Sequence, residues 1–196
     1  MKRAKDKTYS IFQKQIIEAT IEEFNDKGLK FTMDDISKRL GISKRTLYTV
    51  VDDKETLFLE VVDYVFVAIK ESERKIIEDE TLDIMEKITR LIIVLPEKYR
   101  TVNFRKIYEL KEKSPKVFSK IEHKLETDWE PTFELLEMAM EKGKIRRINL
   151  PVFQTMISGT IEHFLSKNTL AENGIPYHQA MEEMIDLILN GAICKS

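Results

Sequence analysis

Apolar residues recur along this chain at the three- and four-residue spacing of a single helix face, and strand-like alternation does not persist anywhere. Between residues 54 and 78, for example, Leu57, Val61 and Val65 share one side, and a run of charged residues returns the segment to solvent. The pattern predicts an all-α chain of about nine helices. These helices are expected over residues 10–26, 33–40, 44–49, 54–78, 82–95, 99–113, 115–140, 152–167 and 178–190.

Prolines and glycines set several of the predicted helix ends. Pro96 is expected to stop the helix before it, because a proline ring removes a hydrogen-bond donor and clashes with the preceding turn. Gly143 is expected to end the helix that begins at residue 115, and residues 171–177 are expected to form a loop. Pro131 lies inside that same helix, where we expect it to kink the helix rather than divide it.

The segment from residue 31 to residue 58 predicts two short helices joined by a tight turn. Thr32 and Asp35 have the spacing of a capping pair at the start of the first helix. Gly41 follows its last apolar residue, where a left-handed backbone costs glycine least. Ser43 is placed to cap the second helix. Together these features predict a helix-turn-helix.

The second of these helices has one apolar and one polar side. Leu47 is expected to point inward, behind a face rich in hydrogen-bond donors. Such a face suits insertion into the major groove of double-stranded DNA, whereas two ordinary core helices would not need it. The outward residues are Lys44, Arg45, Thr46, Tyr48 and Thr49.

The same segment resembles the DNA-binding domain of TetR/AcrR family transcriptional regulators. The segment departs from the family pattern in two ways: Arg45 stands where glycine is common, and Thr49 to Val51 replace the usual aromatic or histidine residues. The Arg45 departure adds a side chain that can read a base. The matching residues are Ile16 to Thr20, Phe24, Gly28, Thr32, Ile36, Leu40 to Lys44, Thr46 to Tyr48, Lys54, Glu55, Leu57 and Phe58.

The resemblance implies an N-terminal three-helix DNA-binding domain over residues 1–53 and a helical effector-binding and dimerisation domain over residues 54–196. It implies a cytoplasmic repressor that binds a palindromic operator as a homodimer and is released by a small apolar ligand. Arg45 and Lys44 are expected to reach guanine edges, with Thr46 on the same face. Phosphate contacts are expected from Thr32, Ser43, Tyr48, Thr49 and Lys54.

The central helices carry many large apolar and aromatic side chains, which suit either an ordinary core or a ligand pocket with a few polar groups. The family resemblance favours a pocket. Its expected lining is Met85, Phe104, Tyr108, Phe118, Trp129, Phe133, Met156 and His163.

The last two predicted helices have apolar and small residues that could form a dimer face, although the same pattern fits burial within one chain. The expected interface residues are Met156, Gly159, Thr160, Met181, Met184, Ile185 and Ile188.

Composition narrows the remaining possibilities. The 196 residues carry a net charge of −2, but residues 1–50 carry +4, which suits DNA binding through one end.

Several other classes of protein are not expected. The single Cys194 excludes an internal disulfide, and the N-terminus lacks the apolar stretch of a signal peptide. No apolar run is long enough to span a membrane. Histidines and carboxylates do not form a metal or catalytic pattern, so we expect no cofactor and no enzyme. Two alternatives stay open: control by a protein partner, and, more distantly, a helical-bundle enzyme.

Overall fold

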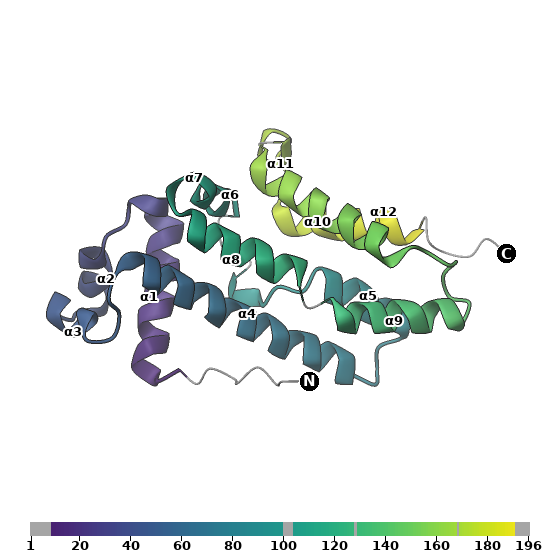
Figure 1. Ribbon diagram of the computed structural model, residues 1–196, viewed down its shortest axis with the longest axis horizontal. Helices are drawn as coiled ribbons and strands as arrows, with labels where there is room; N and C mark the ends of the chain where they lie inside the picture. Colours follow the sequence, from purple (N-terminus) through teal and green to yellow (C-terminus); the bar gives the residue numbers. More distant parts are fainter. Residues whose placement is uncertain (1–8, 100–103, 128, 168, 191–196) are drawn as a thin grey trace. The chain divides into compact units, whose positions relative to one another are not determined.

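The computed structural model describes residues 9–99, 104–127, 129–167 and 169–190, and this part of the chain is helical without a β-strand (Figure 1). The predicted all-α fold is confirmed. The α-helices are α1 (Ile11–Lys27), α2 (Met33–Leu40), α3 (Lys44–Tyr48), α4 (Lys54–Glu78), α5 (Ile84–Ile92), α6 (Phe104–Tyr108), α7 (Leu110–Lys113), α8 (Pro115–Glu126), α9 (Glu130–Glu141), α10 (Leu150–Ser166), α11 (Thr169–Glu172) and α12 (Tyr177–Asn190). Short 3₁₀ turns cover Gly28–Lys30 and Glu97–Tyr99.

The chain divides into two compact units. The first contains residues 1–68 and 101–121, and the second contains residues 69–100 and 122–196. Helices α4 and α8 therefore each begin in the first unit and end in the second. This division describes which residues pack together, and it does not test where the DNA-binding domain ends. The expected functional boundary between residues 53 and 54 stays a prediction.

The core of the first unit holds the helix-turn-helix against α4 and α8. Leu47 of α3 and Ile36 of α2 are fully buried beside Leu57 of α4 and Val117 of α8. Phe58 connects this cluster through aromatic contacts, edge-on to Phe24 at 5.6 Å between ring centroids. Helix α3 has only five residues, so its position depends on these packed neighbours rather than on its own helix propensity.

The second unit has its own core, built from α5, α9, α10 and α12. Ile88, Leu136, Ile157 and Ile185 are fully buried in it. Each comes from a different helix, at the apolar positions of that helix. None of the described helices is both long enough and apolar enough to cross a bilayer.

Pro131 does not kink a continuous helix, so that prediction was wrong. Helix α8 ends at Glu126 and α9 begins at Glu130, which places Pro131 in the first turn of α9. The first N–H groups of a helix have no partner within it, so proline costs no hydrogen bond there.

Three other predicted elements also differ from the structure. The helix expected over 99–113 contains α6 and α7 as separate short pieces, with residues 100–103 outside the described part. Helix α5 is shorter than expected, and α11 occupies the start of the expected loop.

Candidate DNA-binding surface

The first helix of the pair begins and ends with the capping interactions expected from its sequence. The Thr32 hydroxyl accepts a hydrogen bond from the Asp35 N–H at 3.2 Å, and the Asp35 carboxylate accepts one from the Thr32 N–H at 2.8 Å. Gly41 ends α2 in the left-handed region, with φ 65°. These interactions fix both ends of α2 and the direction in which the chain turns toward α3.

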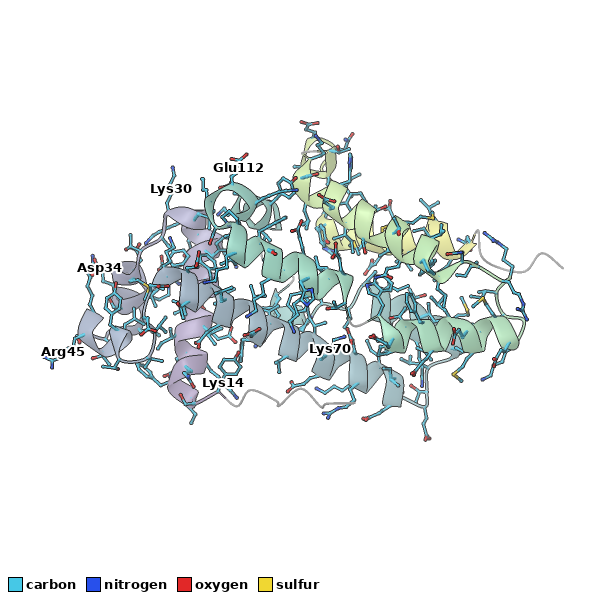
Figure 2. All side chains as sticks on the ribbon, viewed as in Figure 1. Lys14, Lys30, Asp34, Arg45, Lys70 and Glu112 are labelled. Atoms are coloured by element: carbon cyan, nitrogen blue, oxygen red, sulfur yellow. The ribbon has the colours of Figure 1, made fainter. Side chains whose placement is uncertain are left out.

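Helix α3 is held from one side and open on the other. Ser43 caps it, accepting a hydrogen bond from the Thr46 N–H at 3.0 Å. Leu47 is 0% exposed, whereas the residues on the opposite side are exposed. Figure 2 shows Arg45 extending outward at the end of this unit. The exposed residues are Lys44, Arg45, Thr46, Tyr48 and Thr49, so the predicted orientation of the helix is confirmed.

Two of the predicted phosphate-binding hydroxyls already donate their only proton within the protein. The Thr32 hydroxyl donates to the Asp35 carboxylate at 2.8 Å, and the Thr49 hydroxyl donates to the Thr46 carbonyl at 2.6 Å. A hydroxyl has a single donor, and a phosphate accepts only. Both residues therefore stabilise the motif, and neither offers a proton to a phosphate in this arrangement.

Lys54 points toward the segment between α1 and α2, and its expected phosphate contact stays a prediction. Its ammonium donates to the Leu29 carbonyl at 2.7 Å and also to the Phe31 carbonyl. It also lies 4.0 Å from the centroid of the Phe31 ring. Burial lowers the pKa of Lys54 below its ordinary value. The side chain thus joins the first turn of α4 to the segment between α1 and α2.

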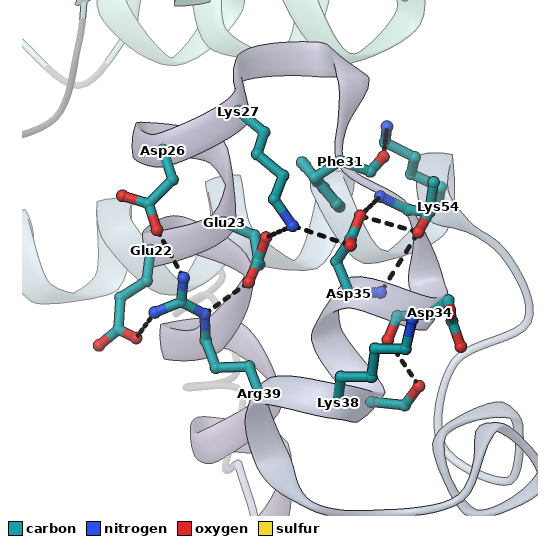
Figure 3. Close-up of polar contacts among 12 residues, drawn as sticks. Glu22, Glu23, Asp26, Lys27, Phe31, Asp34, Asp35, Lys38, Arg39 and Lys54 are labelled. Carbon is teal, nitrogen blue, oxygen red and sulfur yellow. Dashed lines mark hydrogen bonds and ion pairs between the residues drawn. The ribbon is translucent and has the colours of Figure 1, made fainter.

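A cluster of charges joins α2 to α1, and the sequence analysis did not single it out (Figure 3). The Arg39 guanidinium contacts Glu22 at 2.9 Å, Glu23 at 2.6 Å and Asp26 at 2.5 Å. The three carboxylates lie within five consecutive positions of α1 and could have signalled a cationic partner.

Lys27 extends this cluster to the start of α2. Its ammonium lies 2.9 Å from the Glu23 carboxylate and 2.8 Å from that of Asp35. Burial alone would raise the pKa of Glu23, but hydrogen bonds from Lys27 and Arg39 lower it below its ordinary value. The Lys27 hydrogen bond and those from Thr32 hold the pKa of Asp35 well below its usual range. At neutral pH these carboxylates are therefore ionised and brace the motif.

The residues expected to line a ligand pocket occupy several environments. Tyr108 and Phe118 pack in the first unit, with ring centroids 5.6 Å apart. Met85, Trp129 and Phe133 pack around the core of the second unit. Met156 and His163 are exposed on α10, and the side chain of Phe104 lies outside the described part of the chain. The pocket stays a prediction.

Trp129 stands at the junction of α8 and α9. Its indole N–H donates to the Leu125 carbonyl at 3.0 Å, and its ring is tilted against Phe133 with 5.9 Å between centroids. The indole donor is therefore satisfied by a carbonyl at the end of α8. Its ring is only partly buried and remains available as a fluorescent reporter of this junction.

The expected dimer face needs correction at α12. Met181, Met184 and Ile185 are buried in the core of the single chain, and Ile188 is partly buried beside them. Burial in the monomer, the alternative reading of the pattern, therefore holds for these residues. The exposed apolar residue of α12 is Leu187, at 74%, which the sequence analysis missed.

Helix α10 has an exposed face that includes Met156 and Gly159 of the expected interface, and their role in a dimer stays a prediction. Val152, Met156, Gly159 and His163 recur at three- and four-residue spacing, and all four are exposed. Met156 is 52% exposed, and a Cβ added at Gly159 would meet no atom within 4 Å. Thr160, partly buried, directs its hydroxyl back to the Met156 carbonyl at 2.7 Å. A side chain at Gly159 would therefore fit the isolated chain.

Among the described residues, no group of three or more His, Cys, Asp or Glu side chains is arranged to hold a metal ion. Cys194 lies outside that part of the chain.

The sequence of this chain is similar to those of bacterial transcriptional regulators. The family described as "Bacterial regulatory proteins, tetR family" matches residues 16–61, which contain the whole helix-turn-helix. The HTH-type transcriptional regulator YvaF of Bacillus subtilis (strain 168) is 29% identical over 178 residues, covering 91% of this chain and 94% of the relative.

Solved structures share the fold at lower identity. The fatty acid degradation regulator FadR from Bacillus halodurans is similar with a TM-score of 0.65 at 20% identity, covering 93% of this chain and 97% of that one. The ketosteroid transcriptional regulator KstR2 of Mycobacterium tuberculosis is similar with a TM-score of 0.62 at 17% identity, covering 96% and 98%.

Proposed function

Because this chain belongs to the TetR family of bacterial regulatory proteins, we propose that it represses transcription from a palindromic operator as a homodimer and is released by a small apolar ligand. It is a transcriptional regulator of the helix-turn-helix type, and we place its action in the cytoplasm. The observation that carries the proposal is α3, with Leu47 fully buried and Lys44, Arg45 and Tyr48 exposed on the opposite side.

The exposed side chains of α3 suggest distinct roles on DNA. Arg45 extends furthest and can donate two hydrogen bonds to O6 and N7 of a guanine, and Lys44 offers a second cation at the start of the helix. Thr46 lies on the same face. Ser43 and Thr46 share a hydrogen bond at 2.8 Å, which uses one of their two hydroxyl protons and leaves the other for a phosphate. Tyr48 carries a further exposed hydroxyl.

Thr32, Thr49 and Lys54 act through structure in this proposal. Thr32 caps α2, Thr49 closes the end of α3, and Lys54 fastens α4 to the motif. Residues 1–53 then form the part that reads DNA, and residues 54–196 form the part that dimerises and binds the effector. Helices α4 and α8 both continue from one compact unit into the other, and α4 directly follows the motif in the chain, so we propose α4 as the element through which an effector acts on the motif.

A dimer is supported by the exposed face of α10. Val152 and Met156 leave apolar surface in solvent, and Gly159 permits close approach of a second helix. A two-fold dimer presents two copies of α3, so its operator should be an inverted repeat with half-sites separated by a multiple of one DNA turn.

An apolar effector is supported by the side chains around Trp129 and by two proteins of the same fold. The names of those proteins refer to fatty acid degradation and to ketosteroids. Fatty acids and ketosteroids are both largely hydrocarbon. Any such ligand must bind the DNA-free arrangement more tightly than the DNA-bound one, because equal affinity for both would shift no population.

The DNA-binding part of the proposal is tested by selecting duplexes from a randomised pool with the purified chain and mapping the enriched sequence by footprinting. We expect an inverted repeat with two protected half-sites. A pool that shows no enrichment, while the chain still binds DNA, would contradict sequence-specific regulation.

The effector part is tested with a long-chain fatty acid as the probe. We expect a change in Trp129 fluorescence over the same concentration range in which the selected duplex is released. Short-chain acids with the same carboxylate should do neither. If the duplex is released without any fluorescence change, the ligand binds away from Trp129. If apolar compounds fail to release the duplex, the effector is not apolar.

A further inference from the structure

Asp34 lies beside the start of the recognition helix. It is in the first turn of α2, and its carboxylate contacts two cations. One oxygen lies 3.2 Å from the ammonium of Lys44, the first residue of α3, and the other lies 2.8 Å from that of Lys38. Figure 2 shows Asp34 near the outer end of the unit that carries Arg45, and Figure 3 shows its contact with Lys38. A negative charge is thus built into a surface proposed to meet a polyanion.

This charge is permanent under ordinary conditions. The hydrogen bond from Lys38, and then that from Lys44, hold the pKa of Asp34 below its usual range, so the carboxylate is ionised at neutral pH. The pair with Lys44 joins α2 to α3 across the turn, and it is partly exposed to solvent. Its contribution to stability is therefore small, which leaves its effect on binding as the main consequence.

The Asp34 carboxylate has different effects on a contact between Lys44 and a base and on a contact between Lys44 and a phosphate. A lysine ammonium has three donors, so Lys44 can keep Asp34 and still donate to the neutral O6 or N7 of a guanine. A phosphate that approaches Lys44 meets the Asp34 carboxylate as well, and the like charges repel. Lys44 is therefore directed toward bases and discouraged from forming the phosphate contacts that support binding to any sequence.

We propose that Asp34 is a positioning residue that sets sequence discrimination through Lys44, by favouring its contact with a base over its contact with phosphates. This inference rests on the proposed function of α3. It assigns a specificity role to a residue of α2 that faces the recognition helix rather than belonging to it.

The test compares two duplexes of equal length, the one selected by the wild-type chain and a scrambled one of the same composition. Asp34→Asn keeps the side-chain shape and removes the charge. We expect affinity for the scrambled duplex to rise about three- to tenfold, with a salt slope steeper by about 1.8, which is about 0.9 for one added phosphate contact from each subunit of the dimer. Affinity for the selected duplex should change less, so the ratio between the two falls.

Glu112→Gln is the matched control. It makes the same change of net charge at an exposed residue of α7 in the same compact unit. It should leave the ratio of affinities unchanged. If Asp34→Asn shifts both duplexes equally, as a general charge effect would, the inference is overturned.

Lys44→Met supplies a second test that does not depend on how Asp34→Asn folds. Alone, it should weaken binding to the selected duplex while changing the salt slope on the scrambled duplex by much less than about 1.8, the value for one lost phosphate contact in each subunit, because Asp34 already disfavours contacts between Lys44 and phosphates. Combined with Asp34→Asn, it should abolish the effect of that substitution on the ratio. A full loss of one phosphate contact in Lys44→Met would overturn the inference.

Different results would overturn the proposed function and the role of Asp34. An absence of any enriched duplex would overturn the proposed function and this inference with it. An enriched inverted repeat, bound by Asp34→Asn with an unchanged ratio, would overturn this inference alone.

Discussion

The Arg39 guanidinium and the Glu23 carboxylate form a hydrogen-bonded ion pair of 2.6 Å between α2 and α1. Glu23 is only 4% exposed, and its second oxygen lies 2.9 Å from Lys27. The pair fixes the helix that precedes the recognition helix against the body of its unit. It is the strongest candidate for a polar interaction that positions the DNA-binding surface.

Replacing Arg39 with methionine should destabilise the first unit by about 1–3 kcal/mol, because the nearly buried Glu23 carboxylate loses its closest partner. The measurement is the free energy of unfolding in urea. Lys38→Met is the matched control, since its pair with Asp34 is exposed, and it should cost no more than about 0.5 kcal/mol. Equal effects of the two substitutions would show that the Arg39 cluster has no special role.

Lys54→Met separates a structural role from a phosphate contact. Methionine keeps an unbranched apolar side chain, but the Leu29 and Phe31 carbonyls lose their donor and the Phe31 ring loses its cation. We expect a loss of about 1–3 kcal/mol in the free energy of unfolding, with the salt dependence of DNA binding unchanged. An unchanged stability with a salt slope shallower by about 1.8, about 0.9 for each of the two copies of Lys54 in the dimer, would instead support the phosphate contact.

Acid should weaken the brace around Asp35. Its folded pKa is depressed by Lys27 and Thr32, so its contribution to stability is fully present above the unfolded value near pH 4 and is lost as the pH falls below it. We expect the urea midpoint of the wild type to exceed that of Asp35→Asn at pH 7 and the difference to shrink below about pH 4. A difference that stays constant from pH 7 to pH 3 would contradict this.

The α10 face can be tested at one exposed residue. Met156→Arg should give a monomer in sedimentation velocity and weaken operator binding, while the fold of the chain changes little because the side chain is already exposed. Met138 on α9 is similarly exposed, so Met138→Arg is the control and should leave the mass unchanged. Dimers formed by Met156→Arg would place the interface elsewhere. Ile185→Arg should unfold the chain, since that residue is 0% exposed.

The ends of α2 and the start of α3 could be predicted from sequence because each cap involves residues that are close together in the chain. Thr32, Gly41 and Ser43 act on atoms at most three or four positions away, so their capping roles could be predicted. Pro131 could not be placed in the same way. A proline is compatible with a kink or with a first turn, and only the break between α8 and α9 decides between them.

Features that depend on distant residues could not be predicted. The periodicity of α12 shows that Ile185 is apolar and on one face, but not whether its own chain or a second copy covers that face. The direction of the Lys54 side chain depends on carbonyls more than twenty positions away, and Arg39 finds Glu23 sixteen positions away. Long charged side chains reach many neighbours, so their partners require the packed structure.

The exposed face of α3 is proposed to read DNA sequence, and Arg45→Ala removes the side chain that extends furthest from it. Binding should be measured by fluorescence anisotropy on the selected duplex and on a scrambled one. We predict a loss of about 1–3 kcal/mol for each half-site of the selected duplex, relaxed preference at one base pair in each half-site, and little change on the scrambled duplex. An equal loss on both duplexes would make Arg45 a phosphate contact and contradict the claim.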